Sequence, residues 1–275
     1  MRIDIHTHAF SAHRAAEVIA SIVRKSESRC LLTPQGNGTM ADLIRQERVA
    51  GFDRYAICPI ATKPEQFHYM VRYLTALNSG SCGAEAQRCV IPCVSLHPYD
   101  ELAREHIQVL IGLGAKMVKL HPYFQGVPLD HRRMIRLLRI ITEAGLPILC
   151  HTGADVSSDG EPMASPLQII NVYRRVPGLR LICAHCASWK HSETLRFLLG
   201  RSIYVDLAYQ KSTGTEPIVR AFAEQHPQDY VLFGSDWPWC NPAKHAETIA
   251  SWDISKPRLE AIMGGNAQRL LGLTE

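Results

Sequence analysis

One pattern of hydrophobic and polar positions recurs along the chain. In each copy an amphipathic helix-like segment is followed by a glycine-containing turn and a short apolar run that ends in polar residues. The clearest copies are IQVLIGLGAKMVKLHP, RLLRIITEAGLPILCHTG and IINVYRRVPGLRLICAHC. Gly114, Gly145 and Gly178 fall where each helix would end, a position that favours residues tolerating positive φ. The runs after them are continuous in Val, Ile and Leu, which is typical of parallel strands buried on both faces.

The same pattern gives eight strand candidates and a helix between most of them. The strands are expected at 2–8, 55–60, 90–97, 116–121, 147–151, 180–185, 203–208 and 230–235, and the helices at 64–78, 100–113, 130–144, 165–176, 188–199 and 257–271. This alternation predicts an α/β fold, a single (β/α)8 TIM barrel that takes up residues 1–275 as one domain. An open doubly wound sheet is the alternative, but no Gly-x-Gly-x-x-Gly turn follows the first strand.

Residues 10–51 interrupt the alternation after the first strand. They are too many for one helix and contain the polar, glycine-bearing stretch SESRCLLTPQGNGT. We interpret them as an inserted loop between two helical pieces. Such an insertion is either a lid over the mouth of the barrel or a plain surface loop.

Composition narrows the class of protein. The 275 residues are 46% hydrophobic and carry a formal net charge of +4, with Lys and Arg scattered among the acidic residues. This balance indicates neither nucleic acid nor a membrane as a partner, and no membrane span or secretory signal is visible. The nine cysteines, several inside apolar runs, indicate reduced thiols in a cytoplasmic protein. Cys183-x-x-Cys186 follows a strand-like run and does not begin a helix, which argues against a redox motif.

The predicted strand ends carry the candidate chemistry. Catalytic groups of such barrels lie at the carboxyl ends of the strands. Here five strands end in polar residues: His6 and His8, Lys119 and His121, His151, His185, and Asp236. Side chains alternate along a strand, so the first two histidines share one face about 6.6 Å apart. They can bind one ion if His151 and Asp236 approach from across the mouth, and such a donor set favours zinc, iron or manganese.

These endings resemble those of a known family. HTH at 6–8, KLHP at 119–122, HTG at 151–153, AHC at 184–186, GSDWP at 234–238 and GGNAQRLLGL at 264–273 are similar to motifs of the metal-dependent amidohydrolase superfamily, specifically its amidohydrolase 2 group. The resemblance runs from Ile3 to Leu273. It implies a homodimeric barrel enzyme in which His6, His8, His151 and Asp236 bind a catalytic metal, Zn²⁺ first and Mn²⁺ or Fe²⁺ as alternatives.

Two positions decide whether a site of this type holds one ion or two. Members with two ions use a carboxylated lysine on the fourth strand and the histidine of the sixth strand as ligands. Lys119 and His185 stand at those places. In members with one ion the sixth-strand histidine orients or polarises the attacking water, and an uncarboxylated Lys119 would bind a substrate carboxylate beside His121. We favour one ion.

The expected reaction assigns roles to three further groups. A bound divalent ion activates water and polarises a carbonyl group. Asp236 would take the proton of that water and pass it to the leaving group, and His185 would steady the developing oxyanion. Asp4, one step below His6 on the same strand face, is either a support for that histidine or a buried structural acid.

Other residues near the strand ends are candidates for a substrate pocket. Besides Lys119 and His121 they are Phe10, Tyr123, Phe124, Gln125, Trp189, Tyr209, Trp237 and Trp239. The remaining histidines of helices and loops are interpreted as surface residues: His13, His68, His106, His131, His191, His226 and His245.

The function that follows most directly is hydrolysis of a small carbonyl compound, namely an amide, a lactone or an ester. The alternative is non-oxidative decarboxylation of a small carboxylic acid, because the amidohydrolase 2 group also resembles such lyases. An inactive scaffold would lack a ligand, and none is missing here. Hydrolases of the deoxyribonuclease type carry a glutamate where this chain has Lys119, and no basic groove is indicated.

Overall fold

Eight parallel strands form the centre of the molecule, and each pairs with the next one along the chain. The computed structural model describes residues 1–28, 30, 32–156, 158, 160, 162–208 and 214–274. The strands are β1 (Ile3–Thr7), β2 (Arg54–Ile57), β3 (Val90–Val94), β4 (Met117–Leu120), β5 (Ile148–Cys150), β6 (Leu181–Cys183), β7 (Tyr204–Asp206) and β8 (Val231–Leu232). All eight predicted strands are therefore present, although each is shorter than its apolar run.

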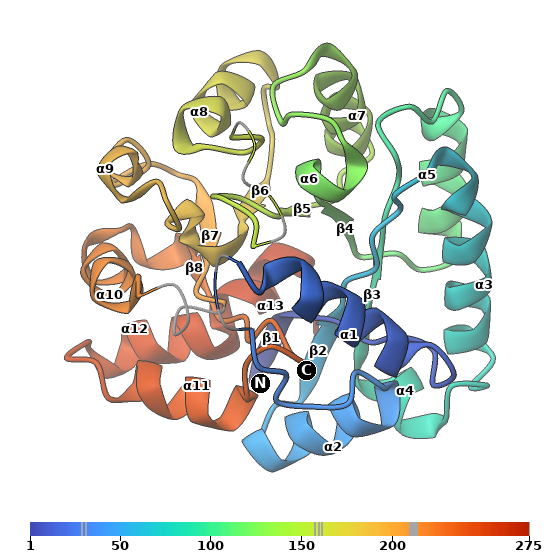
Figure 1. Ribbon diagram of the computed structural model, residues 1–275, viewed down its shortest axis with the longest axis horizontal. Coiled ribbons are helices and arrows are strands. Elements are labelled where there is room, and N and C mark those ends of the chain that lie inside the picture. The colour runs from blue at the N-terminus through green and yellow to red at the C-terminus, as the bar shows by residue number, and fades with distance from the viewer. Residues whose placement is uncertain are drawn as a thin grey trace.

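The first and last strands meet and close the sheet. The amide of Ile5 donates to the Phe233 carbonyl at 3.2 Å, and the amide of Asp236 donates to the His6 carbonyl at 2.7 Å. The His8 amide donates in turn to the carbonyl of Trp237 at 2.7 Å. These bonds continue past the end of β8, so the predicted TIM barrel is confirmed and its seam lies beside the strand-end histidines (Figure 1).

Helices surround the barrel (Figure 1). They are α1 (Ala15–Ser26), α2 (Met40–Ala50), η1 (Pro64–Gln66), α3 (Phe67–Asn78), α4 (Ala84–Cys89), α5 (Ala103–Gly112), α6 (Pro122–Gln125), α7 (Arg132–Glu143), α8 (Pro166–Arg175), η2 (Ala184–Ala187), α9 (Ser192–Leu195), α10 (Glu216–Gln225), η4 (Gln228–Tyr230), α11 (Pro242–Ala250), α12 (Lys256–Glu260), η5 (Ala261–Gly265) and α13 (Asn266–Leu271). In α7 the side chains of Leu138 and Ile141 are buried while Arg132 and Arg139 are exposed. An apolar stripe of this kind holds such a helix against the sheet.

The insertion after β1 contains the two expected helical pieces, α1 and α2. Its first residue is joined to the segment just before α2, because the Phe10 amide donates to the Gly38 carbonyl at 2.8 Å. Gly36 lies so close to the ring of Trp237 that a Cβ atom there would be 2.5 Å from it. Val18 and Ile22 of α1 line the pocket at the barrel mouth. The insertion therefore covers that mouth, which favours the lid over the plain surface loop.

The helix predicted at 188–199 is mostly absent, since only α9 has α-helical structure there. The chain leaves β6 through a turn in which His185, Cys186 and Ala187 have φ values of 57°, 53° and 51°, and Lys190 has a φ of 56°. Left-handed residues cannot continue an α-helix. The physical reason for the short helix is thus the turn that holds the backbone around His185.

Two histidines predicted to lie on the surface are buried. His226 and His245 have exposed fractions of 0% and 7%. The Nε2 atoms of these rings lie 2.8 Å from the carbonyl oxygens of Ile203 and Leu207, respectively. Each ring thus satisfies a carbonyl group flanking β7, which is why the core accommodates it.

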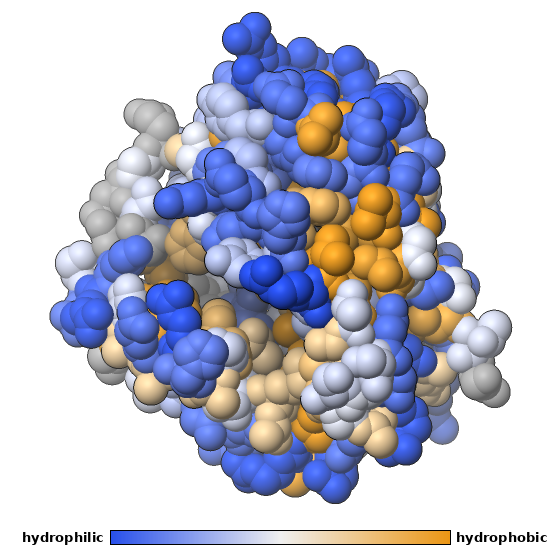
Figure 2. All heavy atoms as spheres, turned by 90° about the vertical axis from the view of Figure 1, so that its right-hand side faces the viewer, coloured by the Kyte–Doolittle hydropathy of each residue, from blue (hydrophilic) through white to orange (hydrophobic). Residues whose placement is uncertain are grey.

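The outer surface over α3 and α5 is mostly hydrophilic, with a group of hydrophobic side chains near its middle (Figure 2). Val109 of α5 is one of the exposed hydrophobic residues. Within the described ranges no helix is both long and apolar enough to cross a membrane. All nine cysteines lie in those ranges and are free thiols, as expected.

Candidate metal centre

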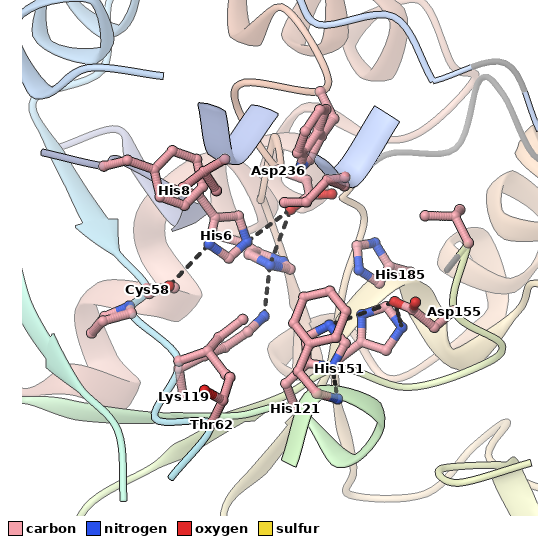
Figure 3. Close-up of a pocket in the computed structure, with 18 of the residues that line it drawn as sticks. His6, His8, Cys58, Thr62, Lys119, His121, His151, Asp155, His185 and Asp236 are labelled. Atoms are coloured by element: carbon pink, nitrogen blue, oxygen red, sulfur yellow. Dashed lines mark hydrogen bonds and ion pairs between the residues drawn. The ribbon is translucent and has the colours of Figure 1, made fainter. Parts of the chain in front are cut away.

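A pocket of about 490 Å³ opens at the carboxyl ends of the strands (Figure 3). Polar side chains from five strand ends line it: His6, His8, Lys119, His121, His151, His185 and Asp236. The residues singled out from the strand endings therefore share one cavity. Two clusters of possible metal ligands lie within it.

The first group consists of His6, His8 and Asp236. The Nε2 atoms of His6 and His8 lie 3.3 Å and 3.1 Å from the same oxygen, Oδ1 of Asp236. The backbone of Asp236 is left-handed, with a φ of 61°. The bond from its amide to the His6 carbonyl fixes it beside β1. These three ligand atoms lie within 4.8 Å of one another, so one ion could contact all of them.

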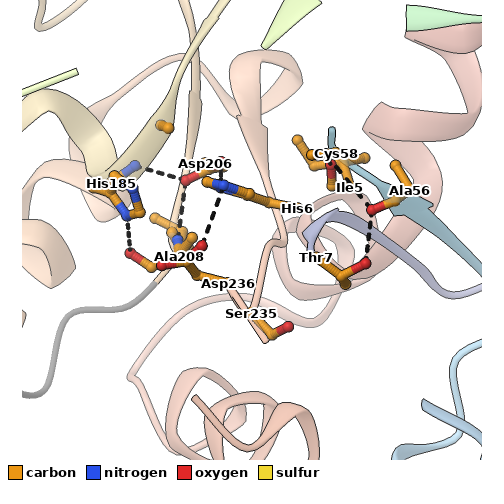
Figure 4. A network of polar contacts seen from close by, with 12 residues as sticks. Ile5, His6, Thr7, Ala56, Cys58, His185, Asp206, Ala208, Ser235 and Asp236 are labelled. Atoms are coloured by element: carbon orange, nitrogen blue, oxygen red, sulfur yellow. Dashed lines mark hydrogen bonds and ion pairs between the residues drawn. The ribbon is translucent and has the colours of Figure 1, made fainter. Parts of the chain in front are cut away.

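The other ring nitrogens of these histidines face hydrogen-bond acceptors, as Figure 4 shows for His6 and Figure 3 for His8. Nδ1 of His6 donates to Oδ2 of Asp206 at 2.9 Å, and Nδ1 of His8 donates to the Cys58 carbonyl at 2.9 Å. A proton on Nδ1 leaves the lone pair of Nε2 free to bind a metal. Nδ1 of His185 likewise donates to the Ala208 carbonyl at 3.1 Å.

Asp206, which ends β7, joins two of the strand ends. Its Oδ2 accepts from His6, and its Oδ1 accepts from the amide of His185 at 2.7 Å and from that of Ala208 at 3.1 Å. It was not singled out from the sequence. The position of Asp206 at the polar end of an apolar strand could have revealed this residue, since the other site residues were found by the same signal.

Lys119 points into the same centre from β4. Its side chain is completely buried, and Nζ lies 2.7 Å from Nε2 of His6. This amine therefore approaches the same nitrogen that faces Oδ1 of Asp236.

The second group contains His121, His151 and Asp155. The Nε2 atoms of the two histidines lie 3.6 Å and 3.4 Å from Oδ2 of Asp155, and the three ligand atoms lie within 4.8 Å of one another. His151 thus lies in the pocket with the first group, with its ring centroid 4.9 Å from that of His185, but its Nε2 faces Asp155. Asp155 lies in the loop after β5 and was missed by the sequence reasoning.

Burial controls the protonation states at the centre. It lowers the pKa of His151 to about 4, helped by the charge of Lys119, and it lowers the pKa values of His6 and His185 in the same direction. For Asp236 burial acts to raise the pKa, but the electrostatic interaction with His6 and the hydrogen bond from His8 outweigh it and bring the pKa below its usual value. Neutral imidazoles and an ionised carboxylate are the forms that bind a divalent ion.

Asp4 connects the two segments that carry the first group. Its Oδ1 accepts from the amides of His6 at 2.9 Å and Ser235 at 3.1 Å. Burial raises the pKa of Asp4 to about 7. The carboxyl group therefore fits both expectations for it: it is a buried acid, and it supports the backbone of His6 and the residue before Asp236.

The residues expected around the pocket divide into two sets. Phe10, Phe124, Trp189 and Trp239 line it, together with apolar residues such as Val18, Ile22, Leu32, Met70 and Val156. Trp237 is completely buried and is not among the residues that line it, and neither is Tyr123, whose hydroxyl donates to the Gly153 carbonyl at 3.0 Å. Gln125 donates to the carbonyl oxygens of Ala61 and Leu96, both at 2.9 Å. Tyr209 lies outside the described residues.

The first group fits a divalent cation. It offers two neutral imidazole nitrogens and one carboxylate oxygen, and oxygen acceptors hold the proton of each ring on the opposite nitrogen. A barrel with such a donor set at the carboxyl ends of its strands belongs to the class of metal-dependent TIM-barrel enzymes. The chain belongs to the amidohydrolase family, whose model matches residues 3–273.

Solved structures share the fold across nearly the whole chain. An uncharacterised TIM-barrel protein from Bordetella bronchiseptica is 18% identical with a TM-score of 0.76, and 98% of each chain is covered. The 5-carboxyvanillate decarboxylase from Novosphingobium aromaticivorans, solved with bound manganese, is 14% identical with a TM-score of 0.71. The match covers 99% of this chain and 97% of the decarboxylase chain. A probable 2-pyrone-4,6-dicarboxylic acid hydrolase from Acinetobacter baumannii, solved with citric acid bound, is 13% identical with a TM-score of 0.65, and 99% of each chain is covered. No curated protein matches the sequence.

Proposed function

We propose that this enzyme hydrolyses a small carbonyl compound, an amide, a lactone or an ester, with the help of a divalent metal ion. The observation that carries the proposal is the convergence of Nε2 of His6, Nε2 of His8 and Oδ1 of Asp236, at separations of 3.3 Å and 3.1 Å. His151, in the same pocket, is the predicted fourth ligand. Zn²⁺ is the ion we propose, with Mn²⁺ and Fe²⁺ as alternatives.

The ion, when bound, lowers the pKa of a coordinated water and polarises the substrate carbonyl. Asp236 is ionised, so it can accept the proton of that water at its second oxygen and pass it to the leaving group. His185 is neutral and has its proton on Nδ1, which leaves Nε2 free to accept a hydrogen bond that orients the attacking water. Lys119 would bind a carboxylate of the substrate, with His121 beside it.

The pocket wall supports a small, largely apolar substrate. Aromatic and aliphatic side chains line most of it, and Lys119 is the one Lys or Arg among the lining residues that the structure describes. A substrate with a flat or aliphatic body and a single anionic group suits such a wall. Water-excluding walls also strengthen the electrostatic effect of the groups at the centre.

Decarboxylation of a small carboxylic acid is the second candidate. It is favoured by the likeness to the manganese-containing 5-carboxyvanillate decarboxylase, which has the same fold at low identity. The two reactions differ in the fate of water, because hydrolysis adds a water oxygen to the product and decarboxylation adds a proton to carbon.

Turnover in oxygen-18 water distinguishes the two reactions. A panel of small lactones, esters, amides and aromatic acids would be incubated with the metal-loaded enzyme and the products analysed by mass spectrometry. We expect one heavy oxygen in the acid product. Release of carbon dioxide with an unlabelled product would contradict hydrolysis, and plasma mass spectrometry of the purified protein identifies the metal.

The substitution His151→Ala tests the site itself. We expect it to abolish turnover while the circular dichroism spectrum and the melting temperature stay close to those of the parent protein. A variant that no longer folds would indicate a structural ion instead of a catalytic one. The free thiols suit the cytoplasmic location that we propose, with a small molecule as the partner and a homodimer as the assembly.

A further inference from the structure

The pocket at the barrel mouth has a largely apolar wall above its polar floor. Strand ends supply the polar residues described above, whereas helix α1 and the segments that follow the strands supply mostly apolar side chains. The pocket volume of about 490 Å³ lies in the range of about 300–1,000 Å³ that encloses drug-sized ligands. A carbonyl group held at the metal ligands fills only part of it, so space remains for another part of the substrate.

Five apolar side chains from distant parts of the chain meet in one region of this wall. Leu32 and Trp239 form the centre of a small hydrophobic cluster, and Ile22 and Val156 pack against it. All four line the pocket. Val18, one helical turn before Ile22, lines the pocket as well. We call these five side chains the apolar compartment; none of them carries a charge.

Helix α1 holds its apolar side chains over the pocket without burying them. It lies across the barrel in the view of Figure 1, and the only residues that it buries are Ala15 and Ser26. In α2, the other helix of the insertion, Leu43 is completely buried. The β-branched apolar residues of α1 are only half-buried: Val18, Ile19, Ile22 and Val23. Apolar surface that borders a cavity in this way gains free energy when an apolar ligand covers it.

The position of α1 over the pocket is fixed at the base of the insertion. A Cβ atom on Gly38 would lie 2.7 Å from Cδ1 of Ile19 and 3.1 Å from the ring of Phe10, so both side chains pack directly on this backbone. The carbonyl of Gly38 also accepts from the Phe10 amide at 2.8 Å. Ile19 therefore anchors α1, while Val18 and Ile22 remain available to a ligand in the pocket.

We propose that the apolar compartment binds a hydrocarbon tail of the substrate. The substrate is then an amphiphilic carbonyl compound, with its reacting group at His6, His8 and Asp236 and its tail under α1. A second ionised group on the tail would lose its hydration there without gaining a charged partner, so the compartment selects against it. This inference rests on the proposed function for the place of the reacting carbonyl, but the tail binds whichever reaction takes place.

Binding of a homologous series of carboxylates tests the apolar compartment without using activity. Carboxylates are products of amide, lactone or ester hydrolysis and are not hydrolysed further. Butanoate, hexanoate, octanoate and decanoate are titrated into the purified full-length protein by calorimetry, below the concentrations at which micelles form. We expect the dissociation constant to fall about fourfold per added methylene until the tail fills the compartment. Octanedioate, which has the length of octanoate but a second carboxylate at its end, should bind at least about tenfold more weakly than octanoate.

Substitutions in α1 locate the tail. Val18→Ser and Ile22→Ser should each weaken octanoate binding about fivefold and leave butanoate binding unchanged, because they remove apolar surface that only the longer tail reaches. The matched control is Val49→Ser on α2, at an exposed side chain that does not line the pocket, and it should bind like the parent protein. Circular dichroism and melting temperatures verify that the variants fold. The series in the parent protein decides alone if they do not.

Octanoate that binds no more tightly than butanoate, or that does not bind at all, would overturn the apolar compartment. So would folded serine variants with the same chain-length dependence as the parent protein. Turnover of short substrates would still support the proposed function in both cases. Conversely, the expected chain-length dependence without turnover of any carbonyl compound would keep the compartment and refute the proposed reaction.

Discussion

The side-chain amine of Lys119 and the imidazole of His6 lie 2.7 Å apart, from Nζ to Nε2. The same Nε2 atom faces Oδ1 of Asp236 at 3.3 Å. A nitrogen lone pair can accept one proton or bind one ion. The amine of Lys119 and a divalent cation therefore compete for the lone pair of His6, and binding of an ion by His6, His8 and Asp236 requires the amine to move away.

Substitution of Lys119 by Met should make metal binding tighter. The variant removes a positive charge from a completely buried position beside the ligand nitrogen. Two like charges about 4 Å apart at a partly screened site repel by about 1–4 kcal/mol, so we expect the dissociation constant for Zn²⁺ to fall at least about fivefold. Competition with a chromophoric chelator measures it.

The matched control for this experiment is Lys116→Met, which removes an exposed lysine next to the same strand and should leave the affinity unchanged. Weaker binding by Lys119→Met would show that Lys119 supplies a ligand atom, as a carboxylated lysine does. Lys119 would then have a different role from the contact with a substrate carboxylate that is proposed above.

Asp206→Asn should weaken metal binding without unfolding the barrel. The carboxylate accepts the Nδ1 proton of His6, and an amide group in its place can turn its own N–H toward that nitrogen. The proton of His6 then moves to Nε2, where it blocks the ion. Loss of an acceptor of this kind costs about 10- to 100-fold in affinity, which chelator competition will measure. Asp229→Asn, at a surface carboxylate paired with Arg269, serves as the control and should bind normally.

The barrel and most of the candidate site could be predicted because buried parallel strands are continuous apolar runs. Polar residues at their ends stand out against such runs, as His6, Lys119 and Asp236 do. The predicted site residues then meet because every strand points the same way around the barrel. The same reasoning extends to Asp206, the last residue of β7.

Other parts of the molecule could not be predicted, for physical reasons. His185 and Lys190 have left-handed backbones although neither is a glycine, so a helical pattern of side chains does not reveal the turn that shortens α9. Asp155 follows β5 in a loop without periodicity, and only the folded chain brings it to His121. His226 can be buried because its ring bonds the carbonyl oxygen of Ile203, a residue distant in the sequence.

Acid should destabilise the fold partly through His226. Burial lowers the pKa of this ring, so below its usual pKa the unfolded chain binds a proton that the folded chain does not. The free energy of unfolding then falls as the pH decreases, with a slope of at most about 1.4 kcal/mol per pH unit for one proton. Urea unfolding from pH 8 to pH 5 should show a smaller loss for His226→Gln than for the parent protein. His13→Gln, at an exposed ring, should follow the parent, and equal pH profiles for all three proteins would refute the assignment.

The junction between the last helical segment and β1 depends on one glycine of an adjacent pair. A Cβ atom on Gly264 would lie 2.2 Å from the Met1 carbonyl oxygen and 3.1 Å from the backbone of Ile3, whereas a Cβ on Gly265 would meet nothing closer than 3.5 Å. The contacts at Gly264 are with backbone, which cannot rotate away as a side chain can. We expect Gly264→Ala to lower the free energy of unfolding by about 1–3 kcal/mol. Gly265, with a helical φ of −57°, should accept alanine without loss or with a small gain. Urea denaturation of the two variants checks the difference, and equal stabilities would mean that β1 does not pack against Gly264 as closely as the structure has it.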